Sequence, residues 1–80
     1  MAETLEQREK IQRSMEDIHR SLVAVSTKLA QLQLDAEADI ELGEAVEDGM
    51  TALAPLTDRL ESLGSAYQME TNRLTNEGEL

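Results

Sequence analysis

The chain has 80 residues with 17 acidic and 7 basic side chains, which give a formal net charge of −10 at pH 7. A chain this short forms one small domain at most and often gains stability by oligomerising. The absence of cysteine excludes disulfides and thiolate chemistry, and no apolar run approaches the ~20 residues that span a bilayer. The acidic balance argues against a broad basic surface for nucleic acid or anionic lipid. The charged first residues argue against a secretory signal, so we expect a cytoplasmic protein.

Residues 4–36 carry the pattern of one amphipathic helix. Apolar side chains recur there in alternating steps of four and three, an unbroken heptad pattern. Thr4 and Gln7 have the spacing of a capping box at the start of this helix. The predicted seam consists of Ile11, Met15, Ile18, Leu22, Val25, Leu29, Leu32 and Ala36.

A turn at about 37–40 is predicted to lead into a second helix over residues 40–74, with Asp39 as its cap. The second seam consists of Leu42, Val46, Gly49, Leu53, Leu56, Leu60, Leu63, Tyr67, Glu70 and Leu74. Gly49 and Pro55 predict that this helix is kinked or broken near 49–55, because proline removes a backbone hydrogen bond and clashes with the preceding turn. Residues 75–80 are expected to fray.

The two heptad patterns predict an all-α, antiparallel two-helix hairpin of the coiled-coil type over residues 1–80. In one register the numbers of facing residues add up to about 78, which pairs Leu29 with Gly49 and sets Arg8 in the same layer as Glu70. That layer favours this register because it places opposite charges together. A second register, one heptad away, uses Leu42 and Gly43 as the turn and stays open at this stage.

Apolar side chains outside the seams predict that the hairpin is completed to a four-helix bundle, by self-association or by a partner. The positions that flank the first seam lack the charge pattern of an isolated two-stranded coiled coil. Spare apolar area needs another surface to cover it. The predicted partner interface consists of Val23, Ala30, Leu34, Met50, Ala54 and Met69.

An acidic run without a single Lys or Arg lies around the predicted turn. It consists of Asp35, Glu37, Asp39, Glu41, Glu44, Glu47 and Asp48. Three interpretations stay open: a solubilising tip, a docking surface for a basic protein, and a mimic of nucleic-acid phosphates. Mimicry is the least favoured, because it needs acids spaced along one face rather than gathered at one end.

Little in the sequence supports catalysis or metal binding. His19, the only histidine, flanks the first seam, and general-base catalysis needs a pocket and a partner carboxylate that a thin hairpin does not offer. Asp35, Glu37 and Asp39 resemble the first ligand positions of a calcium-binding loop. Ile40 and Val46, however, occupy the places where that loop requires Gly and Glu. We therefore predict no catalytic residue, no cofactor and no metal site.

The sequence thus predicts a non-enzymatic, acidic helical interaction protein. It is expected to act as a small regulator, an inhibitor or a chaperone that binds a protein partner through helix packing, as a homodimer or in a hetero-complex. The alternative function is an acidic nucleic-acid mimic or a docking module for a basic protein surface. Neither direct nucleic-acid binding nor membrane binding is expected.

Overall fold

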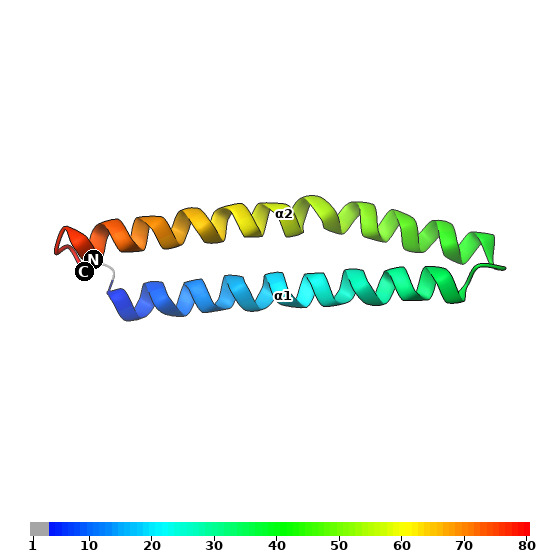
Figure 1. Cartoon of the computed structure of the whole chain (residues 1–80), viewed down its shortest axis with the longest axis horizontal. Helices are drawn as coiled ribbons and strands as arrows, with labels where there is room; N and C mark the ends of the chain where they lie inside the picture. The colour runs from blue at the N-terminus through cyan, green and yellow to red at the C-terminus, as the bar shows by residue number, and fades with distance from the viewer. Residues whose placement is uncertain (1–3) are drawn as a thin grey trace.

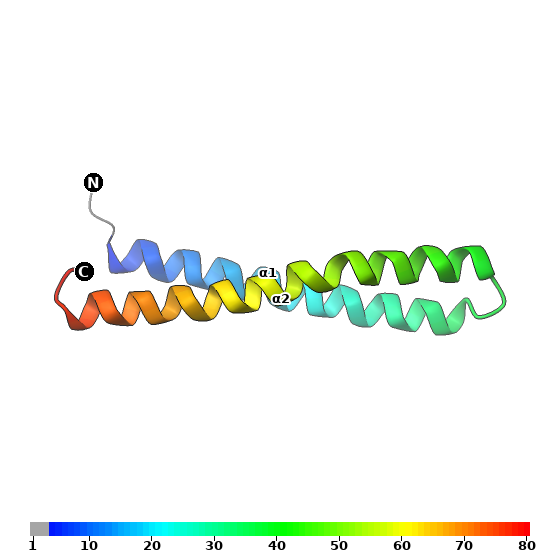
Figure 2. The ribbon, with the colours of Figure 1, turned by 90° about the horizontal axis from the view of Figure 1, so that it is seen from above.

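The computed structural model describes residues 4–80 and shows two long helices that form an antiparallel hairpin (Figure 1). Helix α1 spans Leu5–Asp35 and helix α2 spans Ile40–Asn76. The hairpin is 59 Å long and only 19 Å by 16 Å across. Seen from above, the helices cross near the middle of their length, so they wind around each other (Figure 2). The all-α two-helix hairpin predicted from the heptad patterns is confirmed.

Side chains cap the N-terminus of each helix. Thr4 Oγ1 accepts a hydrogen bond from the Gln7 N–H (3.1 Å), and the Thr4 N–H donates to Gln7 Oε1 (3.0 Å), which completes a capping box. Asp39 accepts from the Leu42 N–H at 3.0 Å and places a negative charge at the positive end of α2. Residues 36–39 therefore form the turn, while Leu42 and Gly43 lie inside α2.

Helix α2 runs through Gly49 and Pro55 without interruption. The sequence left open a break near 49–55, and α2 has no such break. Leu53 and Thr57, on either side of the proline, are both half-buried against α1. The seam therefore stays in phase across Pro55, and packing on α1 supports the helix where its own hydrogen bonding is weakest.

The seam between the helices is rotated relative to the predicted one. On α1 the least exposed side chains alternate between a predicted seam row (Met15, Leu22, Leu29, Ala36) and a row of polar residues (Gln12, His19, Ser26, Gln33). The other half of the predicted seam stays open to solvent: Ile11 is 43% exposed, Ile18 50%, Val25 43% and Leu32 41%. The apolar stripe is wider than one helix–helix contact can cover, and the polar side chains occupy one of its edges.

The same rotation occurs on α2. Its covered rows consist of Val46, Leu53, Leu60, Tyr67 and Leu74 and of Gly43, Met50, Thr57, Gly64 and Thr71. Of the remaining predicted seam residues, Leu42, Leu56 and Leu63 are 39%, 49% and 46% exposed, Glu70 is exposed and Gly49 is half-buried. The interface between α1 and α2 is therefore half apolar and half polar.

Cross-helix contacts place the helices in the first of the two registers. A Cβ added to Gly49 would lie 4.0 Å from Leu29 Cδ1. At the other end, Gln12 Nε2 donates to the Gly64 carbonyl oxygen at 2.9 Å. The numbers of these facing residues add up to 78 and 76, which agrees with the register that sums to about 78.

Candidate protein-interaction site

One side of the hairpin collects most of the exposed aliphatic side chains. Seven of the eleven large hydrophobic residues that are exposed among residues 4–80 belong to the predicted seams but lie outside the observed one. We call them the open face: Ile11, Ile18, Val25 and Leu32 on α1, with Leu42, Leu56 and Leu63 on α2. Contiguous exposed apolar surface of this kind marks interaction sites in soluble proteins.

Helix geometry places both rows of the open face on the same side. Consecutive residues in a helix are rotated by about 100°, so Ile18, three positions after Met15, lies roughly 60° to one side of it, and Gln12 lies on the other side. On α2, Leu56 follows Leu53 by the same three positions. Because the two helices run in opposite directions, their side chains turn in opposite senses when the hairpin is viewed end-on. The same three-residue step on each helix therefore brings the two exposed rows to one side of the hairpin.

The opposite side of the hairpin supports this geometry. Val23 and Ala30 each follow a seam residue of α1 by one position, and Ala54 follows Leu53 of α2 in the same way. These three residues line one shallow groove together with Met50. The positions one residue beyond the seam therefore share a side, which leaves the open face on the other. We call this second side the groove face.

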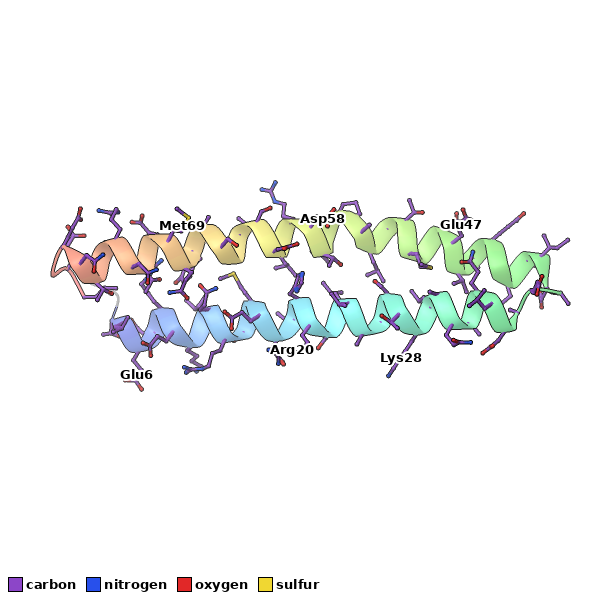
Figure 3. All side chains as sticks on the ribbon, in the orientation of Figure 1. Glu6, Arg20, Lys28, Glu47, Asp58 and Met69 are labelled. Carbon is purple, nitrogen blue, oxygen red and sulfur yellow. The ribbon has the colours of Figure 1, made fainter. Side chains whose placement is uncertain are left out.

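The predicted partner interface is only partly brought together. Val23, Ala30, Met50 and Ala54 meet in the groove face, as just described. Leu34 and Met69 are each 71% exposed and lie near opposite ends of the hairpin. Figure 3 shows Met69 projecting from the edge of α2 that faces away from α1.

A longer groove on the groove face, with a volume of about 720 Å³, contains more polar residues. His19 lines it beside Gln12 and Gln68, with Glu16, Arg20 and Glu61 at its margins. The groove face is therefore charged and amide-bearing along this stretch. Half of the ten positions that flank the open face are small and uncharged: Ser14, Ser21, Ala45, Ala52 and Ala66. Four of the others are charged: Lys28, Asp35, Arg59 and Arg73. The small residues let a further helix approach closely.

The predicted polar layer around Arg8 has different members. Arg8 is 5% exposed; its Nε donates to Thr71 Oγ1 at 2.8 Å, and its Nη2 donates to the Tyr67 carbonyl oxygen at 3.4 Å. The guanidinium also lies 3.9 Å from the centre of the Tyr67 ring, a cation–π contact. The sequence did not identify Thr71 and Tyr67 as the partners of Arg8. Thr71 is, however, the residue that directly follows Glu70, the partner that was predicted for Arg8.

Glu70 lies outside the seam and is exposed. Hydrogen bonds from Arg73 hold the pKa of the Glu70 carboxyl below its usual value, and the more distant positive charge of Arg8 contributes least. Arg73 also forms an ion pair with Glu77, and its own pKa is raised, mainly by the hydrogen bonds to Glu70. Arg8 and Glu70 therefore lie at the same level of the hairpin, but Glu70 accepts its hydrogen bonds from Arg73.

All seven side chains of the acidic run are exposed. They surround the turn and the adjoining ends of both helices, and no basic residue lies between Lys28 and Arg59. Figure 3 shows Glu47 directed away from α1 at this end of the molecule. Within the described part of the chain, no group of three or more potential ligands is arranged to hold a metal ion.

Comparisons with models of known protein families, with curated protein sequences and with solved structures find no match to this chain. Among residues 4–80, no helix combines the length and the apolar character that crossing a bilayer requires. The exposed aliphatic residues on this extended hairpin indicate association.

Proposed function

We propose that this chain is a non-enzymatic interaction protein that associates through helix packing, with the open face as its binding surface. The observation that carries the proposal is the open face itself: seven aliphatic side chains in two rows, one on each helix, that are 39–50% exposed on one side of the hairpin. The molecule as described has a thin core, since Val46 is the one hydrophobic residue that is buried among residues 4–80. Further helices on the open face complete a four-helix bundle and give these side chains the cover they lack.

The energetics support binding at this surface. Covering the remaining exposed part of a large aliphatic side chain contributes roughly 1 kcal/mol, so the open face offers several kcal/mol per hairpin. Binding has to offset a loss of translational and rotational freedom of ~4–15 kcal/mol. The open face can meet this cost only if most of its length is covered at once, which favours a long helical partner. A small regulator, an inhibitor or a chaperone for amphipathic helices works in this way.

A second candidate function rests on the acidic run. Seven exposed acids at one end, with no base among them, form a surface that suits docking of a basic protein. Mimicry of nucleic acid is less well supported, because the acids gather at one end rather than along a face. Contacts of exposed charges weaken with salt, whereas apolar helix packing does not.

Capture of partners by the immobilised protein at 0.15 M and 0.5 M NaCl tests the proposal. We expect captured proteins to stay bound in 0.5 M NaCl, to be lost with Leu56→Ser on the open face, and to be retained with the control Leu34→Ser. Leu34 is an exposed leucine outside the open face. Binding that disappears in 0.5 M NaCl and is unaffected by Leu56→Ser would instead support docking through the acidic run.

A further inference from the structure

The charge of the hairpin is divided between its two ends. Residues 29–49, at the turn end, contain seven acids and no base. Four of the seven basic residues lie toward the other end, where α1 begins and α2 finishes: Arg8, Lys10, Arg13 and Arg73. We call this second end the terminal end. Its bases are interspersed with acids, so it is close to neutral by comparison with the turn end.

The side of the hairpin that carries the open face is large enough for a stable interface. The hairpin is 59 Å long and 19 Å wide, so one side spans about 1,100 Å² before side-chain relief is counted. Specific protein–protein interfaces bury ~800 Å² on each partner. From Ile11 to the level of Leu42 the open face extends for roughly 38 Å at the ~1.5 Å rise per residue. A partner that covers it must be at least that long, and a second copy of this chain, 59 Å in length, satisfies this.

We propose that the open face is covered by a second copy of this chain, lying antiparallel, so that the turn end of each copy lies against the terminal end of the other. This inference rests on the proposed function and adds the identity and the orientation of the partner. The orientation follows from charge. A parallel pair would bring fourteen acids together at one end with no base among them, whereas the antiparallel pair sets each acidic end beside an end where bases are interspersed with acids, which lowers the repulsion.

The two-fold axis of this dimer passes through the open face near Leu56. The row on α1 extends from Ile11 to Leu32 and is centred between Ile18 and Val25. Leu56 lies near the middle of α2, at the same height along the hairpin. A rotation about this point places Ile18 of one copy at the height of Val25 of the other and Leu56 over Leu56, while Leu63 lies at the height of Gly49 and Leu42 at the height of Glu70. The four helices then form a bundle with Met15, Leu22 and Leu29 beneath these side chains.

A spin label at the turn separates the two orientations. The chain has no cysteine, so Ala38→Cys provides a single attachment site at an exposed, uncharged position in the turn. In the antiparallel dimer the two labels lie near opposite ends of the assembly, and pulsed electron paramagnetic resonance should give a separation on the order of 50 Å, set by the ~1.5 Å rise per residue. Dilution with unlabelled chain should remove this signal, and circular dichroism should show unchanged helix content.

The mass of the unlabelled protein accompanies this measurement. We expect sedimentation equilibrium to give 17.8 kDa, twice the 8.9 kDa of one chain. A label separation below ~30 Å would indicate a parallel dimer and overturn the orientation, because both turns then share one end of the bundle. A monomer, or an assembly larger than a dimer, would overturn the inference as a whole. A monomer that still captures salt-resistant partners through Leu56 would leave the proposed function intact.

Discussion

At the terminal end of the hairpin polar side chains form hydrogen bonds across the seam, whereas at the turn end the most buried seam residue is apolar and the charges lie outside the seam. Arg8, Gln12 and Thr71 form directional cross-helix contacts at the terminal end. At the turn end Leu29 packs near Gly49, and Val46 is 5% exposed. Directional bonds between specific atoms fix the register, while apolar packing supplies burial without choosing among registers one heptad apart.

The terminal end is also incompletely satisfied. Gln12 Oε1 and the Tyr67 hydroxyl are buried without a hydrogen-bond partner among the described residues. A buried polar atom without a partner costs ~1–3 kcal/mol, so part of what the Arg8 contacts contribute is offset there. The turn end has a different cost, which is repulsion among seven acids. Four sets of variants sharpen this comparison, from the largest expected effect on stability to the smallest.

Arg8→Ala should lower the free energy of unfolding by about 2 kcal/mol. The variant loses the guanidinium with its hydrogen bonds to Thr71 and Tyr67, and it leaves a cavity in the seam. Urea denaturation at a fixed protein concentration measures this loss. A double-mutant cycle with Thr71→Val should give a coupling of about 1 kcal/mol, and the corresponding cycle with Glu70→Gln only a few tenths. A larger coupling to Glu70 than to Thr71 would contradict the observed partners of Arg8.

At the turn end, Asp39→Ala should cost about 1 kcal/mol, because the cap of α2 is lost. Asp39→Asn is the matched control: it keeps a capping oxygen and removes one charge from the acidic run. The asparagine variant should therefore be as stable as the original protein or slightly more stable, since self-repulsion decreases. Thermal unfolding of the two variants compares the cap with the charge directly. Equal destabilisation by both would show that the carboxylate itself is required.

Gly43→Ala should raise the free energy of unfolding by roughly 0.5–1 kcal/mol, because Gly43 lies inside α2 and a Cβ there meets no atom within 4 Å. Gly64→Ala is the comparison at the terminal end. There a Cβ would contact Gln12 Nε2 at 3.8 Å, beside the hydrogen bond to the Gly64 carbonyl. We expect a smaller gain for Gly64→Ala in the same denaturation experiment. Destabilisation by Gly43→Ala would mean that this stretch of α2 is not helical.

The smallest effect concerns Glu70, whose side chain is exposed. Because its pKa is lowered in the folded protein, its contribution to stability is present above the usual glutamate pKa and is lost as the pH falls through the lowered value. Arg73→Gln should return the pKa of Glu70 toward its usual value, as an NMR titration of the side-chain carboxyl would show. Arg8→Ala should shift it much less, and the reverse order would place Arg8 as the main partner of Glu70.

Much of this fold could be predicted from the sequence because it depends on local rules. Heptad spacing defines two helices, Thr4 and Asp39 satisfy the first backbone N–H groups of each, and the layer containing Arg8 selects the register. The rotation of the seam could not be predicted in the same way. Ile11 and Gln12 compete for the same interface, and hydrophobicity alone favours Ile11.

The outcome depends on contacts between the helices that no single segment encodes. Gln12 reaches the Gly64 carbonyl across the seam, and Arg8 reaches Thr71 two turns further along α2. This rotation turns four of the eight predicted seam residues of α1 and three of the ten of α2 into the open face. The predicted partner interface, built from apolar residues outside the seams, therefore omitted the larger apolar surface, which the sequence pattern had assigned to the core of the hairpin.

The most direct test of the open face compares Ile18→Ser with Val23→Ser by sedimentation equilibrium at equal concentration. Both positions are β-branched residues of α1 with similar exposure, 50% and 45%, and they lie on opposite sides of the hairpin. We predict that the original protein and Val23→Ser sediment as dimers near 17.8 kDa, twice 8.9 kDa, while Ile18→Ser sediments as a helical monomer. A dimer that survives Ile18→Ser but dissociates with Val23→Ser would contradict the account and assign association to the groove face.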